Sequence, residues 1–139
     1  TALLFILPYQ NLELNMAKKI LIIEDAVSLA ENLSGALRDN GFLVTIANDG
    51  ESGFRQAQEG HPDLILLDLV LPKKHGLKVL EDLNQDAGLK TIPVIVLTNL
   101  EDSTDIEGAS SFGIKAYLVK ANYSLPEIVE KIKEVLPPA

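Results

Sequence analysis

The feature that most constrains the fold of this chain is a regular alternation between short apolar runs and segments whose apolar residues recur at helical spacing. Continuous apolar runs suit strands that are covered on both faces, so the alternation predicts repeated strand–helix units around a parallel sheet. The runs that fit strands are at 20–23, 43–47, 63–68, 93–98 and 116–119. Helical spacing predicts helices over 29–37, 52–59, 77–83, 102–111 and 124–136. We therefore expect one α/β domain with helices on both faces of a five-stranded parallel sheet.

Composition restricts the location and the partners of the protein. A chain of 139 residues, 47% of them hydrophobic, is long enough for one compact core. The net charge of −8 argues against direct nucleic-acid binding, which depends on clustered Lys and Arg. The absence of cysteine excludes disulfides and thiolate metal sites and fits a cytoplasmic protein. No apolar run approaches the roughly 20 residues that span a bilayer, so we expect no membrane contact.

The first fifteen residues, TALLFILPYQNLELN, stand before Met16, the only methionine of the chain. We expect the natural domain to comprise residues 16–139, with residues 1–15 as an N-terminal extension that is not part of it. The alternative is that this segment is a strand or helix that packs on the domain. Its apolar patch, residues 3–7, is too short for a membrane span.

Polar side chains stand at the ends of the predicted strands. They are Glu24 and Asp25 after the first strand, Asp68 at the end of the third, Thr98 at the end of the fourth and Lys120 after the fifth. In an open parallel sheet, ligands bind outside the carboxyl ends of the strands, where the strand order reverses. We therefore expect three carboxylates, a hydroxyl and an amine to meet in one cleft. Asp68 should lie at the rim of the sheet and not in its core.

Such a cluster suggests phosphoryl-transfer chemistry. Neighbouring carboxylates repel one another, so a cation or the Lys120 ammonium has to offset their charge. Oxygen ligands suit Mg²⁺, which takes one or two protein carboxylates. A metal ion beside a carboxylate nucleophile and a lysine can position and neutralise a phosphoryl group. Asp68 could then attack that group and become an acyl phosphate.

The segments ILIIED, DLILLDLVLPKKHG, PVIVLT and AYLVK, in this order and at these separations, resemble the receiver domain of two-component response regulators. The resemblance extends over about residues 18–136. It implies a flavodoxin-like (CheY-like) fold, which is a doubly wound five-stranded parallel sheet of order 2-1-3-4-5. It also implies a part in two-component phosphorelay signal transduction, in which the domain catalyses its own phosphorylation and slow dephosphorylation but is mainly a signalling switch and not a turnover enzyme.

The resemblance implies roles for the acidic residues. Asp68 resembles the family's phosphoacceptor, which takes a phosphoryl group from a phosphohistidine on a histidine kinase or a histidine phosphotransfer protein. Asp25 and Asp68 would bind Mg²⁺ directly, together with the backbone carbonyl of Val70. Glu24 would act on the metal mainly through water.

Further roles concern the phosphoryl oxygens and the output of the switch. Thr98 and Lys120 resemble the pair that binds those oxygens, and Tyr117 stands where the family has a switch aromatic that changes rotamer as the threonine moves. The signal would reach a face formed by the helix at 102–111, the strand at 116–119 and the last helix. The resemblance implies that a downstream protein target, or an output domain missing from this chain, recognises this face. It also implies that the domain is a monomer or a phosphorylation-dependent dimer.

The chain departs from the family pattern at three places. Ala121 follows Lys120 where the family usually has a proline after a cis bond. A cis bond before a non-proline residue costs about 3–4 kcal/mol, so either strain is tolerated there or the loop differs. Asn99 is larger than the usual residue and would narrow access to the phosphoryl site. Val70 and Leu100 flank the path of the attacking water, and because neither side chain can orient water we predict a long-lived phosphoryl group.

Other protein classes fit less well. A phosphohydrolase of the haloacid dehalogenase type would need a second acid two residues after its nucleophile, where this chain has Val70. A flavin-binding protein of the same fold would need a phosphate-binding loop after the first strand, where the segment IEDAVS offers carboxylates. A phosphorylation-independent protein-interaction module of the same fold stays open, because Asn99 and Ala121 depart from the receiver pattern.

Overall fold

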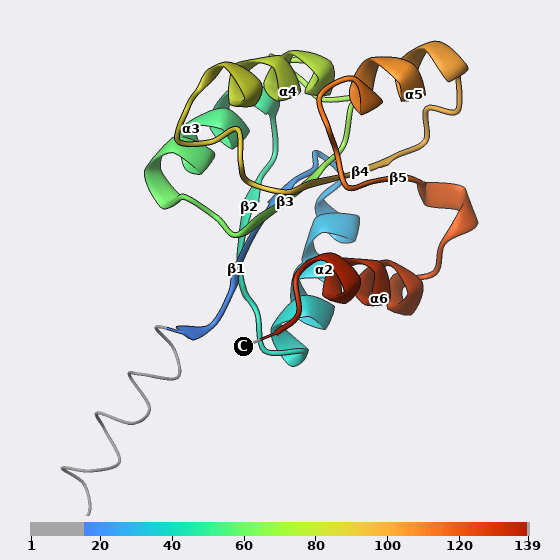
Figure 1. The fold of residues 1–139 in the computed structure, drawn as a ribbon. Helices are drawn as coiled ribbons and strands as arrows, with labels where there is room; N and C mark the ends of the chain where they lie inside the picture. The colour runs from blue at the N-terminus through green and yellow to red at the C-terminus, as the bar shows by residue number, and fades with distance from the viewer. Residues whose placement is uncertain (1–15, 139) are drawn as a thin grey trace, which may run out of the picture.

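The computed structural model describes residues 16–138, which fold around a five-stranded sheet (Figure 1). Residues 1–15, the predicted extension, lie outside the described part of the chain. The strands are β1 (Lys19–Ile23), β2 (Leu43–Ala47), β3 (Leu64–Leu67), β4 (Val94–Thr98) and β5 (Ala116–Val119). Neighbouring strands are parallel and their order is β2-β1-β3-β4-β5. The predicted flavodoxin-like strand order is confirmed.

Helices cover both faces of this sheet. They are α2 (Val27–Asp39), α3 (Gly50–Gly60), α4 (Gly76–Gln85), α5 (Ser103–Ser110) and α6 (Leu125–Val135). Figure 1 shows α2 and α6 on one face and α3, α4 and α5 on the other. Within residues 16–138, none of the helices is both long enough and apolar enough to cross a membrane.

The strands divide their side chains between two cores, one under each helical layer. Ile20 and Ile22 belong to the core that includes side chains of α2 and α6, whereas Leu21 and Ile23 belong to the core under α3, α4 and α5. Because both faces are covered, a strand without any polar position is stable here, and all residues of β3 are buried. Burying one Leu or Ile side chain contributes about 1.5–3 kcal/mol, so the apolar runs supply much of the stability of the sheet.

Capping side chains determine where α3 and α4 begin. The structure starts α3 at Gly50, two residues before the predicted start, because Asp49 caps the helix and its Oδ1 accepts the Ser52 N–H at 2.8 Å. At α4 the cap is His75, whose Nδ1 accepts the Leu77 N–H at 3.1 Å. The first turn of α4 is thereby fixed directly after the loop that follows β3.

Gly76 opens α4 against the end of β3. A methyl group on this glycine would lie 2.5 Å from the carbonyl oxygen of Asp68 and 2.5 Å from the Cα of Leu69. Backbone atoms cannot move aside as the end of a side chain can, so we expect Gly76→Ala to lower the free energy of unfolding by about 2 kcal/mol. Urea denaturation measures this effect.

The matched control is Gly35→Ala. Gly35 lies inside α2 and an added methyl group there meets nothing within 4 Å. Alanine is the better helix former, so this variant should gain about 0.5–1 kcal/mol. If Gly76→Ala proved as stable as Gly35→Ala, the inference that α4 packs closely on the end of β3 would be wrong.

Candidate functional site

Three carboxylates converge at the carboxyl ends of β1 and β3. The two strands are neighbours, with Ile23 beside Leu67, and the Asp68 N–H donates to the Ile23 carbonyl oxygen at 3.0 Å. Glu24 and Asp25 therefore share one edge of the sheet with Asp68. One oxygen from each of these three side chains lies within 4.8 Å of the others, a spacing that could hold one metal ion. We call these three residues the acidic cluster.

The members of the acidic cluster differ in exposure. Glu24 is 3% exposed and Asp68 is 5% exposed, whereas Asp25 is exposed. Asp68 stands at the end of its strand as predicted, but its side chain is buried and not open at the rim. The chain after β3 folds back over the strand end, where the Gly76 N–H donates to the Leu69 carbonyl oxygen at 2.8 Å. Lys120 Nζ lies against the same carboxylate, 2.9 Å from Asp68 Oδ2.

Lys120 supplies positive charge to the acidic cluster. Its Nζ lies 2.6 Å from Glu24 Oε1 and donates to Asp68 Oδ2 at 2.9 Å. Burial lowers the pKa of Lys120, but the hydrogen bonds to Glu24 and Asp68 outweigh burial and raise the pKa above its ordinary value. Burial raises the pKa of Glu24, and the Lys120 hydrogen bond opposes only part of that rise. The ammonium thus contacts two of the three carboxyl groups, and a cation that the cluster could hold would offset the remaining negative charge.

Backbone N–H groups orient two of the carboxylates. The Val70 N–H donates to Asp68 Oδ1 at 3.1 Å, and the Ala26 N–H donates to Glu24 Oε2 at 3.0 Å. The sequence could not indicate these two donors, because the direction of a loop N–H depends on backbone conformation and not on residue type. The Val70 backbone is thereby held beside Asp68, while its side chain is 52% exposed.

Thr98 ends β4 as a fully buried residue. Its partner in register on β5 is Val119, the residue before Lys120, so the hydroxyl and the ammonium come from neighbouring strand ends. Among the described residues, Thr98 Oγ1 is a buried side-chain oxygen without a hydrogen-bond partner. Buried hydroxyls are nearly always hydrogen-bonded, so this atom marks a place where a ligand oxygen or a water can bind.

Tyr117 connects β5 to the loop after β4. Its hydroxyl donates to the Leu100 carbonyl oxygen at 2.7 Å, and its ring is half-buried against the core under α3, α4 and α5. Burial raises the pKa of Tyr117, and the negative charges of Asp105 and Asp68 add to the rise. The hydroxyl is thereby held by the loop that leads from β4 to α5.

The loop after Lys120 differs from the family pattern that the sequence resembles. Residues 16–138 contain no cis peptide bond, and Lys120–Asn122 forms a short 3₁₀ helix, η1. The Lys120–Ala121 bond is therefore trans, and Lys120 reaches both Glu24 and Asp68 from this conformation. Asn99, directly after Thr98, is exposed.

Lys74 anchors the loop beside the acidic cluster, a role that no sequence pattern indicated. Its Nζ lies 2.6 Å from Asp82 Oδ2 of α4 and 4.8 Å from the centre of the Phe54 ring of α3. The Gly50 N–H also donates to the Pro72 carbonyl oxygen at 3.2 Å. The loop that carries Val70 is thus tied to both neighbouring helices.

The fold, the strand-end acids and the half-buried Lys120 define the class of protein. Residues 20–133 match the response regulator receiver domain family. This chain belongs to that family, and it is a receiver domain of two-component signalling. The phosphorylation-independent interaction module that the sequence left open is not favoured by this membership.

Two regulators and one solved structure illustrate the relationship. Phosphate regulon transcriptional regulatory protein PhoB of Klebsiella pneumoniae is 36% identical over 121 residues, which are 87% of this chain and 52% of PhoB. DNA-binding response regulator MtrA of Mycolicibacterium paratuberculosis is 34% identical over 118 residues, which are 85% of this chain and 51% of MtrA. This chain thus spans about half the length of these curated relatives. The crystal structure of the Mn²⁺-bound form of response regulator Rcp1 has a TM-score of 0.75 and 32% identity, covering 84% of this chain and 92% of that one.

Proposed function

We propose that Asp68 accepts a phosphoryl group from a phosphohistidine on a partner protein, in a step that needs Mg²⁺, and thereby switches a protein-interaction surface. The observation that carries this proposal is a buried carboxylate with an ammonium 2.9 Å away, at the same sheet edge as the unpartnered hydroxyl of Thr98. A carboxylate can attack phosphorus, while an ammonium and a hydroxyl can bind the phosphoryl oxygens.

The donor set of the acidic cluster fits a hard divalent cation. Every candidate ligand is an oxygen, and Mg²⁺ prefers oxygen ligands at about 2.0–2.1 Å while keeping several waters. We infer that Asp25 and Asp68 hold the ion directly with the Val70 carbonyl, and that Glu24 acts through water. The Mn²⁺ bound by Rcp1, a relative at 32% identity, supports a divalent cation here. The bound ion would neutralise charge on the phosphoryl oxygens.

In the proposed reaction, an Asp68 carboxylate oxygen attacks phosphorus in line with the phosphohistidine nitrogen. The new O–P bond forms as the P–N bond breaks, and the electron pair of that bond returns to the imidazole, which leaves neutral because its other nitrogen carries a proton. Asp68 is then an acyl phosphate. Lys120 can exchange its contact with the carboxylate for one with a phosphoryl oxygen, and the Thr98 hydroxyl can donate to another.

Thr98 and Tyr117 offer a path from this site to the surface. Leu100 lies two residues after Thr98, and its carbonyl oxygen accepts the Tyr117 hydroxyl. When Thr98 moves toward a phosphoryl group, the Leu100 carbonyl shifts and the Tyr117 ring can adopt a second position. The face formed by α5, β5 and α6 then changes between two populations, which is the output of the switch.

The proposed partners follow from this scheme. A histidine kinase or a histidine phosphotransfer protein supplies the phosphoryl group, and a protein target or an output domain reads the changed face, in a monomer or a phosphorylation-dependent dimer. PhoB and MtrA are named as a transcriptional regulator and a DNA-binding protein, but the match to this chain covers only about half of their length. A net charge of −8 argues that this domain itself does not bind nucleic acid. We infer action in the cytoplasm.

Intact-mass measurement after incubation with acetyl phosphate tests the proposal. We expect one added phosphoryl group on the wild-type protein with Mg²⁺, none after chelation with EDTA, and none on Asp68→Asn. Asparagine has the shape of aspartate but is a far weaker nucleophile, so the fold is kept while the acceptor is lost. Asp63→Asn, which changes an aspartate at the opposite end of β3, should be phosphorylated like the wild type.

Other results would change the proposal in defined ways. An adduct that persists on Asp68→Asn would place the acceptor on another residue. An adduct that forms equally well in EDTA would remove the metal ion from the step. Absence of any adduct on a folded protein, even with a phosphorylated histidine kinase as donor, would favour a receiver that acts without phosphate.

A further inference from the structure

The loop between β3 and α4, residues 68–75, leads from the acidic cluster to the start of α4. Asp68 begins this β3–α4 loop, and the Val70 N–H donates to Asp68 Oδ1 at 3.1 Å. The Gly76 N–H closes the loop by donating to the Leu69 carbonyl oxygen at 2.8 Å. The position of the Val70 backbone therefore depends on how the rest of the loop is held.

The β3–α4 loop contains a residue that does not favour its own backbone conformation. Lys73 has a φ of 68°, in the left-handed region that favours glycine. Its ion pair with Asp49, 3.7 Å between Nζ and Oδ2, adds little, because the Lys73 side chain is 62% exposed. The Pro72 carbonyl oxygen, by contrast, accepts the Lys74 N–H at 2.7 Å and the Gly50 N–H at 3.2 Å. A loop with such a residue keeps its shape only because contacts with the surrounding structure hold it.

Lys74 makes the strongest of these contacts. Its Nζ lies 2.6 Å from Asp82 Oδ2 of α4 and 4.8 Å from the centre of the Phe54 ring of α3. The Lys74 and Asp82 side chains are only 22% and 17% exposed, so water and salt screen their attraction less than that of an exposed pair. The Lys74 backbone is held as well, because a methyl group on Gly50 of α3 would overlap the Lys74 carbonyl oxygen. Lys74 thus fastens the loop to both helices.

We propose that Lys74 is a positioning residue for the divalent cation, because it holds the β3–α4 loop in the shape that keeps the Val70 backbone beside Asp68. This inference rests on the proposed function, in which the Val70 carbonyl oxygen is a ligand of that cation. Residues that orient metal ligands from outside typically change metal affinity by about 10- to 100-fold when they are replaced. Loss of the Lys74 ammonium should therefore weaken cation binding, although every ligand is still present.

The sign of the expected effect separates positioning from charge. Lys74→Met makes a chain of net charge −8 more negative still. A more negative protein attracts a cation more strongly, so charge alone would tighten cation binding. Positioning predicts the opposite, an affinity about tenfold weaker. Weaker binding by Lys74→Met could therefore not be attributed to the lost charge.

Mn²⁺ binding measures this affinity without any phosphoryl donor. Mn²⁺ is a suitable probe because the relative Rcp1 binds it, and the electron paramagnetic resonance signal of the free ion reports how much remains unbound. We expect Lys74→Met to bind Mn²⁺ with a Kd about tenfold higher than that of the wild type. The double variant Lys74→Met with Asp82→Asn keeps the net charge of the wild type. It should bind Mn²⁺ as weakly as Lys74→Met, because both changes remove the same ion pair.

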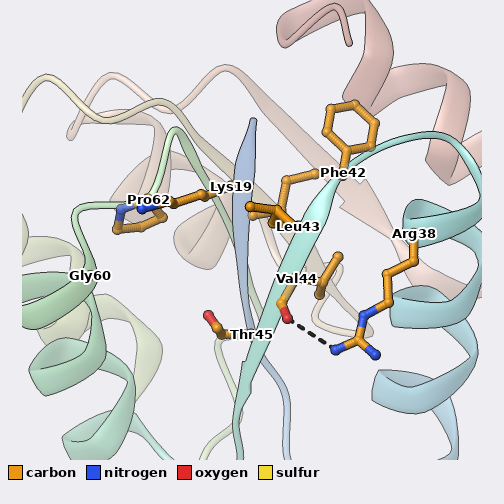
Figure 2. Close-up of a pocket in the computed structure, with 9 residues that line it drawn as sticks. Lys19, Arg38, Phe42, Leu43, Val44, Thr45, Gly60 and Pro62 are labelled. Atoms are coloured by element: carbon orange, nitrogen blue, oxygen red, sulfur yellow. Dashed lines mark hydrogen bonds between the residues drawn. The ribbon is translucent and has the colours of Figure 1, made fainter. Parts of the chain in front are cut away.

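Two other lysines provide matched controls. Lys78 Nζ lies 3.3 Å from Asp82 Oδ1, but Lys78 belongs to α4 and not to the loop. Lys19 is an exposed residue at the start of β1, and with Pro62 it lines a cavity of about 380 Å³ at the amino-terminal end of the sheet, away from the acidic cluster (Figure 2). Lys78→Met and Lys19→Met should each bind Mn²⁺ at least as tightly as the wild type, since each loses one positive charge and neither side chain holds the loop.

Amide hydrogen exchange, followed by NMR without divalent cations, tests the position of Val70 directly. The Val70 N–H donates to Asp68 Oδ1, so its exchange should be faster in Lys74→Met than in Lys78→Met. Leu66 is a fully buried residue of β3, and its amide should exchange at the same rate in both variants. A role of Lys74 in stability alone would speed the exchange of Leu66 as well.

Two results would overturn the inference. If Lys74→Met bound Mn²⁺ as tightly as Lys78→Met, the loop would hold its cation ligand without Lys74. If the Val70 amide exchanged at the same rate in these two variants, Lys74 would not fix the Val70 backbone.

Phosphorylation by acetyl phosphate separates this inference from the proposed function. Lys74→Met should need about tenfold more Mg²⁺ to reach half of its maximal rate, but should reach the wild-type rate when Mg²⁺ saturates the site. If the wild type took up no phosphoryl group while Lys74→Met still bound Mn²⁺ more weakly, the proposed phosphorylation would fail and the role of Lys74 would stand. Phosphorylation of the wild type with equal Mn²⁺ affinities of Lys74→Met and Lys78→Met would give the reverse result.

Discussion

Lys120→Met is expected to lower the free energy of unfolding by about 3–5 kcal/mol at neutral pH without divalent cations. The Lys120 ammonium contacts Glu24 Oε1 at 2.6 Å and Asp68 Oδ2 at 2.9 Å, and both carboxyl groups are almost completely buried. Methionine fills a similar volume without charge, so the variant leaves two buried carboxylates without their cation. Removing one member of a buried ion pair is far more costly than removing an exposed lysine.

The stability lost in Lys120→Met should diminish as the pH falls. Burial raises the pKa of Glu24, and loss of the Lys120 hydrogen bond, which lowers that pKa in the wild type, raises it further. A carboxyl group with a raised folded-state pKa binds its proton more readily in the folded protein. The resulting stabilisation is complete below the unfolded-state pKa, ordinarily 4.5, and is lost as the pH rises through the folded-state pKa. The variant should therefore approach the wild type between neutral pH and about pH 4.5.

Urea denaturation at pH 7 and pH 5, with and without Mg²⁺, measures both effects. Lys115→Met is the matched control, since Lys115 is an exposed lysine just before β5 and its loss should cost less than about 1 kcal/mol. Millimolar Mg²⁺ should recover part of the stability of Lys120→Met, because a bound cation replaces the missing ammonium and favours the folded state. Equal stability of the two variants would show that the acidic cluster does not depend on Lys120.

The strand order and the gathering of the polar strand ends could be predicted from the sequence. Each apolar run is a local signal, and one topological rule places the carboxyl ends of parallel strands at a single edge. Asp68 and Lys120 are 52 residues apart, yet they meet because both follow strands of the same sheet. The start of α3 is harder to predict, because an aspartate such as Asp49, in the segment NDG (residues 48–50), can either form a turn or cap a helix. In the structure Asp49 caps α3.

The finer properties of the site depend on loops that have no periodic pattern. The loop after β3 is held by Lys74, which contacts Asp82 and the Phe54 ring. The missing hydrogen-bond partner of Thr98 depends on every group around that hydroxyl and not on its neighbours in the sequence. These features follow from three-dimensional contacts alone, so residue types and spacings could not indicate them.

A phosphoryl group on Asp68 is expected to be long-lived, because the side chains that would flank the attacking water cannot hold it. Val70 lies two residues after Asp68, and Leu100 lies two residues after Thr98, beyond the ends of the neighbouring strands β3 and β4. Val70 is exposed without a polar atom in its side chain, and the Leu100 side chain packs against the core. A positioned proton acceptor typically contributes about 10²–10⁴ to such a rate, and neither position offers one.

Val70→Asn and Leu100→Glu should each shorten the half-life of the phosphorylated protein by at least about tenfold, because each adds a group that can orient water toward phosphorus. The decay of the phosphorylated mass after removal of acetyl phosphate measures this, with Val70→Leu as the control that changes shape but adds no polar atom. Since Val70 is 52% exposed, an asparagine there should not disturb the fold, so a changed decay rate would reflect chemistry at Asp68. If both polar variants decayed at the rate of Val70→Leu, the attacking water would have to approach by another path, and Lys120 and Thr98 would be left as the groups that set the lifetime.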